Sequence, residues 1–241
     1  MELERYLYEL LSFISVVILQ KADIFIYLLY NIIYLMNNSY DDTENKILGN
    51  LLRIPLNSKS LNQLSKDVSL SYVTVFKVVP ELEKKKLVVI EKKGKSNLVS
   101  IDFVNASLQK LSSSIIFEQI KLYKKQSILK LISNEIEEHL SSNFYALLLF
   151  GSYAKGTARK DSDIDLLLIV PAISEDYSEK LSNVFRLYPK INCKIIKAKD
   201  FSEMLNQRNS VGRAAFENGI VLFGAEQYYL MVKSYVRQKG Y

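Results

Sequence analysis

Two strongly apolar runs stand near the start of the chain, at residues 10–19 and 24–36. Each is shorter than the roughly 18–20 residues that a helix needs to span a membrane. We therefore expect two short helices that bury both faces at the interface of a homodimer, and a membrane-associated hairpin is the alternative. The polar residues 37–42 that follow are predicted to form a turn or linker.

The next segment, residues 43–101, follows the order helix, helix, helix and β-hairpin. Thr43, Ser60 and Ser71 stand where N-cap residues are expected, each just before an apolar run of helical period. Pro55 ends the first helix, because its nitrogen carries no hydrogen for the helical ladder. Two strands, and the basic loop between them, are predicted at residues 87–90, 98–101 and 91–97.

Apolar residues then recur at the helical period from Leu108 to Leu140. One or two helices are expected there, as a spacer between domains or a zipper between subunits. Residues 144–200 predict a mixed sheet with helices on one side, which gives an α+β fold class. The expected parts are an apolar helical extension, a helical domain with a hairpin, a helical spacer and a sheet domain, at residues 1–42, 43–104, 105–143 and 144–241.

The amino-acid composition excludes several kinds of functional site. The chain is 49% hydrophobic and 24% charged, which is typical of a packed protein. It has one cysteine, Cys193, and one histidine, His139, so an internal disulfide and a zinc site of thiolates and imidazoles are both excluded. A metal must then sit on carboxylate oxygens, which suits Mg²⁺ or Mn²⁺. Glu2 and Glu4 are opposed only by Arg5, unlike the start of a secretory signal, so we expect a cytoplasmic protein.

Positive charge is concentrated in one region. From Arg53 to Ile101 there are ten basic residues and four acidic ones, so this segment carries +6, which is the formal net charge of the whole chain. Such a distribution is expected of a nucleic-acid-binding module joined to a neutral partner. A lysine-rich face that is merely solvated is the alternative.

The stretch from Leu61 to Gly94 resembles the winged helix-turn-helix domains of prokaryotic regulators. The resemblance implies that the second helix of the pair enters the major groove of double-stranded DNA and that the hairpin contacts phosphates. Pro80 departs from the pattern and is expected to kink this helix or end its first half. A winged helix used only for protein contacts is the alternative. The implied DNA-binding residues are Ser71, Tyr72, Thr74, Val75 and Lys77 on the helix, and Lys92, Lys93 and Lys95 on the hairpin.

A second motif carries the chemistry. A strand ending at Phe150 runs into Gly151-Ser152, and after ten residues a second strand is predicted to begin at Asp163 with Asp163-Ile164-Asp165. Glycine lets a phosphate approach the backbone, and Ser152 adds a hydroxyl and an amide at the start of a short helix, predicted at residues 153–159. Aspartates two apart on a strand face the same side, where they can hold a divalent metal.

This string, with Gly156 included, resembles the nucleotidyltransferase superfamily that includes DNA polymerase beta. It is closest to the minimal nucleotidyltransferases and to archaeal proteins that join a winged helix to such a domain, and the resemblance covers roughly residues 140–230. It implies that Gly151 and Ser152 bind the triphosphate of a nucleotide such as ATP. It further implies that Asp163 and Asp165 are catalytic and ligate Mg²⁺ or Mn²⁺. Lys155 and Arg159, four apart on the short helix, are candidate phosphate ligands, with a solvated position as the alternative.

The third carboxylate of that family is missing. It is expected on the next core strand, residues 191–197, where this chain has Asn192 and no acid. Asparagine is neutral and cannot act as a base. Two functions therefore stay open, a DNA-binding nucleotidyltransferase with an unknown acceptor, and a regulator or antitoxin-like protein with an impaired domain and a toxin-like partner.

Overall fold

The computed structural model describes residues 39–140, 145–172, 175–207 and 210–239. The two apolar N-terminal runs, predicted to be helices at a dimer interface, lie outside the described residues. Residues 44–241 form one compact unit. Among the helices described, none is long and apolar enough to cross a membrane.

The predicted order of three helices and a hairpin is confirmed in the N-terminal part of this unit. Ser60 and Ser71 are the N-caps of the second and third helices, where their side chains accept hydrogen bonds from the amides of Gln63 and Thr74. A two-residue strand that was not predicted pairs with the second hairpin strand. The elements are α2 (Ser39–Leu52), β1 (Lys59–Ser60), α3 (Leu61–Asp67), α4 (Tyr72–Lys84), β2 (Val88–Lys93) and β3 (Ser96–Ile101).

Three local predictions in this region were wrong. Residues 39–42 are helical and not a turn, so Thr43 lies inside α2 and is not its N-cap. The hairpin loop is reduced to Gly94-Lys95, because Lys92 pairs with Asn97 and Lys93 with Ser96 in the ladder. Pro80 does not end the first half of α4, which continues to Lys84 with Pro80 on its exposed face.

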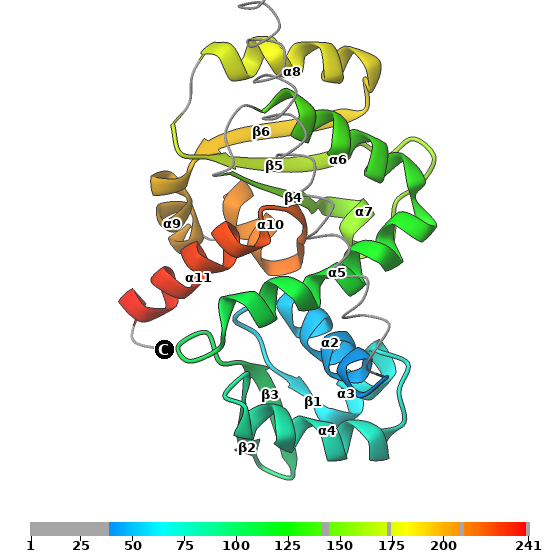
Figure 1. Ribbon diagram of the computed structural model, residues 1–241, viewed down its shortest axis with the longest axis vertical. Helices are drawn as coiled ribbons and strands as arrows, with labels where there is room; N and C mark the ends of the chain where they lie inside the picture. Colours follow the sequence, from blue (N-terminus) through cyan, green and yellow to red (C-terminus); the bar gives the residue numbers. More distant parts are fainter. Residues whose placement is uncertain (1–38, 141–144, 173–174, 208–209, 240–241) are drawn as a thin grey trace, which may run out of the picture. The chain divides into compact units, whose positions relative to one another are not determined.

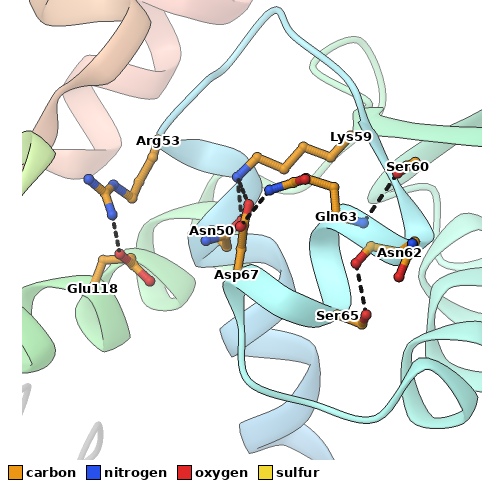
Figure 2. Close-up of polar contacts among 9 residues, drawn as sticks. All are labelled: Asn50, Arg53, Lys59, Ser60, Asn62, Gln63, Ser65, Asp67 and Glu118. Atoms are coloured by element: carbon orange, nitrogen blue, oxygen red, sulfur yellow. Dashed lines mark hydrogen bonds and ion pairs between the residues drawn. The ribbon is translucent and has the colours of Figure 1, made fainter.

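A polar seam joins α2 to α5 (Leu108–Lys125), with three contacts along it. At its start, the buried Glu44 carboxylate of α2 lies 3.9 Å from Lys110 Nζ of α5. Further on, the Ser114 hydroxyl donates to Asn45 Oδ1 over 3.0 Å. At the C-terminal end of α2, Arg53 donates to Glu118 of α5 over 3.3 Å (Figure 2). The Glu118 side chain is only 8% exposed, and Arg53 compensates its buried charge.

The second sheet has the strand order β6-β5-β4-β7 and is mixed, as predicted. Its neighbours β4 and β5 are antiparallel, as are β4 and β7, whereas β5 and β6 are parallel. The elements of this part are α6 (Ser127–His139), β4 (Ala146–Phe150), α7 (Gly151–Lys155), β5 (Ile164–Val170), α8 (Glu175–Leu187), β6 (Ile191–Lys197), α9 (Ala198–Asn206), α10 (Val211–Asn218), β7 (Ile220–Phe223) and α11 (Ala225–Lys239).

Helices cover both faces of this sheet, so the prediction of helices on one side was wrong (Figure 1). Residues of α6 and α8 pack with Leu166 and Leu168 of β5, whereas residues of α9, α10 and α11 pack with Leu167 and Ile169. The reason is that β5 is apolar at successive positions and must bury both faces. The face of Leu167 is the one that carries the candidate site.

Candidate functional site

Asp165 is the second residue of β5 and lies between two strands. It pairs with Phe150 of β4 on one side and with Asn192 of β6 on the other. Ile164 is buried in the opposite layer, and Asp165 is half-buried on the face of Leu167. The strand begins at Ile164, so the prediction that it begins at Asp163 was one residue too early. Asp163 lies just outside the ladder, is exposed, and has no hydrogen-bond or ion-pair partner in the described part of the chain.

Gly151 brings the backbone of α7 against Asp165. It follows Phe150, the β4 partner of Asp165, and has a φ of +70°. A Cβ at this position would lie 2.2 Å from Asp165 Oδ2. Only glycine combines that φ with that approach, so residue 151 must be glycine for the carboxylate and the start of α7 to be adjacent.

Helix α7 is shorter than predicted. It ends at Gly156, which has a φ of +73°, and the Thr157 amide donates back to Ser152 O over 2.9 Å. This left-handed residue terminates the helix, so Arg159 is not on it. Arg159 instead lies in an exposed turn in which its amide donates to Ser162 Oγ over 2.8 Å. Lys155 and Arg159 are therefore not paired on one helical face, as had been predicted.

Asn192 occupies the position predicted for the missing carboxylate. The register pairs it directly with Asp165, and its Nδ2 donates to Asp165 Oδ1 over 3.0 Å. Lys194 comes next on the same face, opposite Leu167. Cys193 points to the other layer, where burial raises the pKa of its thiol to about 12. It is thus neither a nucleophile nor a metal ligand for this site.

The donor set suits one hard divalent cation. Asp163 and Asp165 supply carboxylate oxygens, which Mg²⁺ and Mn²⁺ prefer. Asn192 uses its amide nitrogen toward Asp165, and no cluster of three or more acidic, histidine or cysteine side chains able to hold a metal exists among the residues described. The residues present fit a single metal between two aspartates, and they lack the third acid that a second metal needs.

Residues 132–228 match the polymerase beta, nucleotidyltransferase family. They form a polymerase beta nucleotidyltransferase domain. The match starts within α6 and ends in α11, and it contains the Gly151-Ser152 step together with Asp163, Asp165 and Asn192. Proteins of this family typically use divalent metals, which agrees with the carboxylate site. No curated protein and no solved structure matches the chain.

The nucleotidyltransferase domain begins earlier in the chain than the resemblance alone suggested. Its match includes the second half of α6, which had been assigned to the spacer. Ile132 and Ile136 of α6 are fully buried against the sheet, in the same cluster as Leu166. Helix α6 therefore covers the sheet, and the helical periodicity of this segment gave no indication of that.

The predicted DNA-binding residues of α4 fall into two groups. Tyr72 and Lys77 are exposed, but Val75 is completely buried and cannot contact a ligand. Ser71 and Thr74 are engaged with each other as the helix cap, with 2.7 Å between their hydroxyl oxygens. On the hairpin, all three predicted lysines are exposed, namely Lys92, Lys93 and Lys95.

Two features of functional interest were missed. Phe76 is 53% exposed and stacks on Tyr72 with 6.0 Å between ring centroids, although the helical pattern alone gives no reason for an exposed pair. In the sequence, Arg53 is one of ten basic residues between positions 53 and 101 and has no distinguishing local pattern. In the structure it donates to Ala154 O of α7 as well as to Glu118, over sequence separations of 101 and 65 residues. No local signal could have indicated these long-range contacts.

Proposed function

We propose that the nucleotidyltransferase domain binds a nucleoside triphosphate with Mg²⁺ or Mn²⁺ and transfers the nucleoside monophosphate to the hydroxyl of an acceptor. The observation that supports this most directly is the contact between Gly151 and Asp165. It places the start of α7, where phosphates can approach the backbone, beside a carboxylate suited to a metal. The Ser152 hydroxyl has no hydrogen-bond partner among the residues described, so it can donate to phosphate.

In the proposed reaction, the acceptor oxygen attacks the α-phosphorus and forms a new P–O bond. The bond from that phosphorus to the oxygen bridging to the β-phosphate breaks, pyrophosphate leaves, and the hydroxyl proton passes to solvent. Gly151 and Ser152 orient the leaving phosphates, and Arg159 is proposed as a further phosphate ligand, whereas Lys155 lines a separate pocket. Asp163 and Asp165 hold the metal, which when bound neutralises charge on the phosphate oxygens.

The test is to incubate the protein with ATP labelled at the α-phosphate, Mg²⁺ or Mn²⁺, and cell extract. We expect label on an acceptor from the wild type and none from Asp163→Asn with Asp165→Asn. The matched control is Glu179→Gln with Glu203→Gln, which also removes two negative charges from exposed positions of the same region. Equal labelling by the aspartate variant would refute the proposed role of the two carboxylates.

A second function is favoured by one specific observation, the hydrogen bond from Asn192 to Asp165. An amide there supplies no negative charge and no base, so the domain would act in nucleotide sensing or partner binding, within a regulator or an antitoxin-like protein with a toxin-like partner. Metal-dependent nucleotide binding without any labelled product, even with extract, would favour this alternative. A homodimer, expected from the N-terminal apolar residues, is compatible with either function.

We also propose that the N-terminal part is a winged helix-turn-helix that binds double-stranded DNA. Support comes from the +6 charge of residues 53–101 and from the exposed positions of Tyr72, Lys77 and the three hairpin lysines. Tyr72 lies at the first turn of α4, which is the part of a recognition helix that reaches base edges. We expect Lys77 and the three hairpin lysines to contact phosphates.

Binding to duplex DNA should weaken steeply with salt. Replacing Lys92, Lys93 and Lys95 by Ala is expected to reduce the slope of log K against log salt by up to about 3 and to weaken all sequences alike. Tyr72→Ala should instead change the preference between sequences. A triple alanine control at exposed lysines elsewhere, Lys124, Lys130 and Lys199, should leave the slope nearly unchanged. Fluorescence anisotropy over a salt series measures both.

The opposite outcome would identify a protein-contact module. If duplex DNA does not bind at low salt, the exposed face of α4 is better explained by its apolar side chains. Tyr72, Val73 and Phe76 are 50%, 60% and 53% exposed, an unusual concentration of apolar surface on one helix.

A further inference from the structure

Two adjoining pockets lie where α2, α5 and α7 meet, with volumes of about 230 and 350 Å³. Arg53, Lys121 and Lys155 line both of them. We call the two together the basic pocket, whose cationic residues are Arg53, Lys59, Lys121, Lys125 and Lys155. Neither part is lined by Gly151, Ser152, Asp163 or Asp165.

Two of the five cations, Arg53 and Lys59, form ion pairs with acidic residues of the pocket lining. Arg53 is bound to Glu118 and to the Ala154 carbonyl. Lys59 lies 2.6 Å from Asp67 Oδ2 and 2.7 Å from Asn50 Oδ1 (Figure 2). These contacts hold Arg53 and Lys59 against groups of α2, α3, α5 and α7 around one space.

The other three cations face the pocket without compensation. Lys121, Lys125 and Lys155 are exposed and have no hydrogen-bond or ion-pair partner among the residues described. Five basic residues against Glu118 and Asp67 leave a charge of +3 on the lining. Like charges brought together in a concave site repel each other and attract an anion.

The spacing of the cations indicates more than one anionic group. Lys121 and Lys125 are one turn apart on α5, whereas Lys155 belongs to α7 and Arg53 directly follows α2. The cations come from three separate elements and line two adjoining spaces, which is more charge and more room than one phosphate group needs. Phosphate groups linked in a chain can contact these cations together, since each accepts charge-assisted hydrogen bonds from lysine.

We propose that the basic pocket binds a ligand with two or more phosphate groups, at a site separate from the Asp163 and Asp165 carboxylates. The lining offers no unpaired carboxylate, so this binding needs no metal. The ligand would contact α2 of the N-terminal part and α7, whose first residue lies against Asp165. Occupancy of the pocket therefore connects the N-terminal part with the nucleotidyltransferase motif.

The experiment measures binding of tripolyphosphate to the full chain in EDTA by calorimetry. Lys121→Ala with Lys125→Ala should weaken binding at least about tenfold, the loss expected for two charge-assisted contacts at exposed lysines. Lys124→Ala with Lys130→Ala removes the same charge from exposed positions outside the pocket and should change binding less than twofold. Asp163→Asn with Asp165→Asn should leave it unchanged.

Three results overturn the proposal. They are the absence of tripolyphosphate binding in EDTA, an equal loss in the Lys124 and Lys130 control, and a loss caused by the two aspartate substitutions. The last would mean that the pocket is part of the metal site. Since the measurement contains no metal and no acceptor, failure of nucleotidyl transfer does not affect it.

Competition then identifies the source of the phosphates. Displacement of tripolyphosphate by ATP, but not by a single-stranded oligonucleotide, assigns the pocket to free nucleotides or polyphosphate. Displacement by the oligonucleotide, lost in the Lys121 and Lys125 variant, assigns it to a nucleic-acid backbone. Either result supports a phosphate-binding pocket.

Discussion

Asn192→Asp is expected to raise nucleotidyl transfer by about 10²- to 10⁴-fold, or to create it where the wild type has none. The side chain already lies in the right place, because Asn192 pairs with Asp165 in the parallel ladder and its Nδ2 is 3.0 Å from Asp165 Oδ1. A carboxylate there adds a third negative ligand within reach of a second metal. It also adds a base that can accept the proton of the attacking hydroxyl.

Lys194 opposes this gain. It follows Asn192 on the same face of β6 and is exposed, so its ammonium can compete with a second metal. Asn192→Asp with Lys194→Ala is therefore expected to exceed Asn192→Asp alone. Labelled transfer from ATP measures both, with Asn183→Asp as the control for an added negative charge, because Asn183 is exposed on α8. DNA binding should be unchanged in all of them.

A wild type that already transfers at rates typical of enzymes, with no gain from either variant, would contradict this prediction. In that case the third group must come from elsewhere, such as another subunit. Activity can also be lost because a variant does not fold. Thermal unfolding with and without Mg²⁺ distinguishes a misfolded variant from a folded variant that lacks activity. In the Asn192→Asp variant, Mg²⁺ should raise the unfolding temperature more than in the wild type, because two facing carboxylates repel unless a cation lies between them.

Asp163→Asn with Asp165→Asn is expected to abolish metal-dependent nucleotide binding. The substitution keeps the shape of both side chains, but it removes the two carboxylates that are proposed to hold the metal. Without the metal, the charge of the triphosphate is not neutralised beside Gly151. Titration of ATP with Mg²⁺ and with EDTA measures the effect.

The basic pocket requires a matched background for this titration. The wild-type aspartates and the Asp163→Asn with Asp165→Asn variant are both best measured in a chain that also carries Lys121→Ala and Lys125→Ala. These two substitutions remove the metal-independent binding of ATP to the basic pocket. Glu179→Gln with Glu203→Gln is again the charge control and should leave binding intact. In the Lys121→Ala with Lys125→Ala background, the contrary result is an ATP affinity that changes neither on adding EDTA nor on replacing both aspartates by Asn. That result would mean that the aspartate motif has lost its function.

The features that the sequence predicted correctly depend on residues close together in the chain. Ser60 and Ser71 cap helices because each side chain reaches an amide three residues on. Strand alternation likewise put Asn192 on one face of β6 and Cys193 on the other. Side-chain reach and strand periodicity are properties of the local chain, so the sequence alone contains them.

Other features were decided by tertiary packing. Successive apolar residues of β5 show that the strand is buried, but not which helices cover each face. The sequence therefore predicts a spacer where α6 packs against the sheet. Val75 belongs to the helix start that was expected to contact DNA, yet packing against the core buries it completely. Lys121 and Arg53 line one pocket because α2 and α5 pack into the same core, and the Arg53–Glu118 pair joins residues 65 apart in the chain. Burial and electrostatic pairing depend on distances in space, which sequence periodicity does not encode.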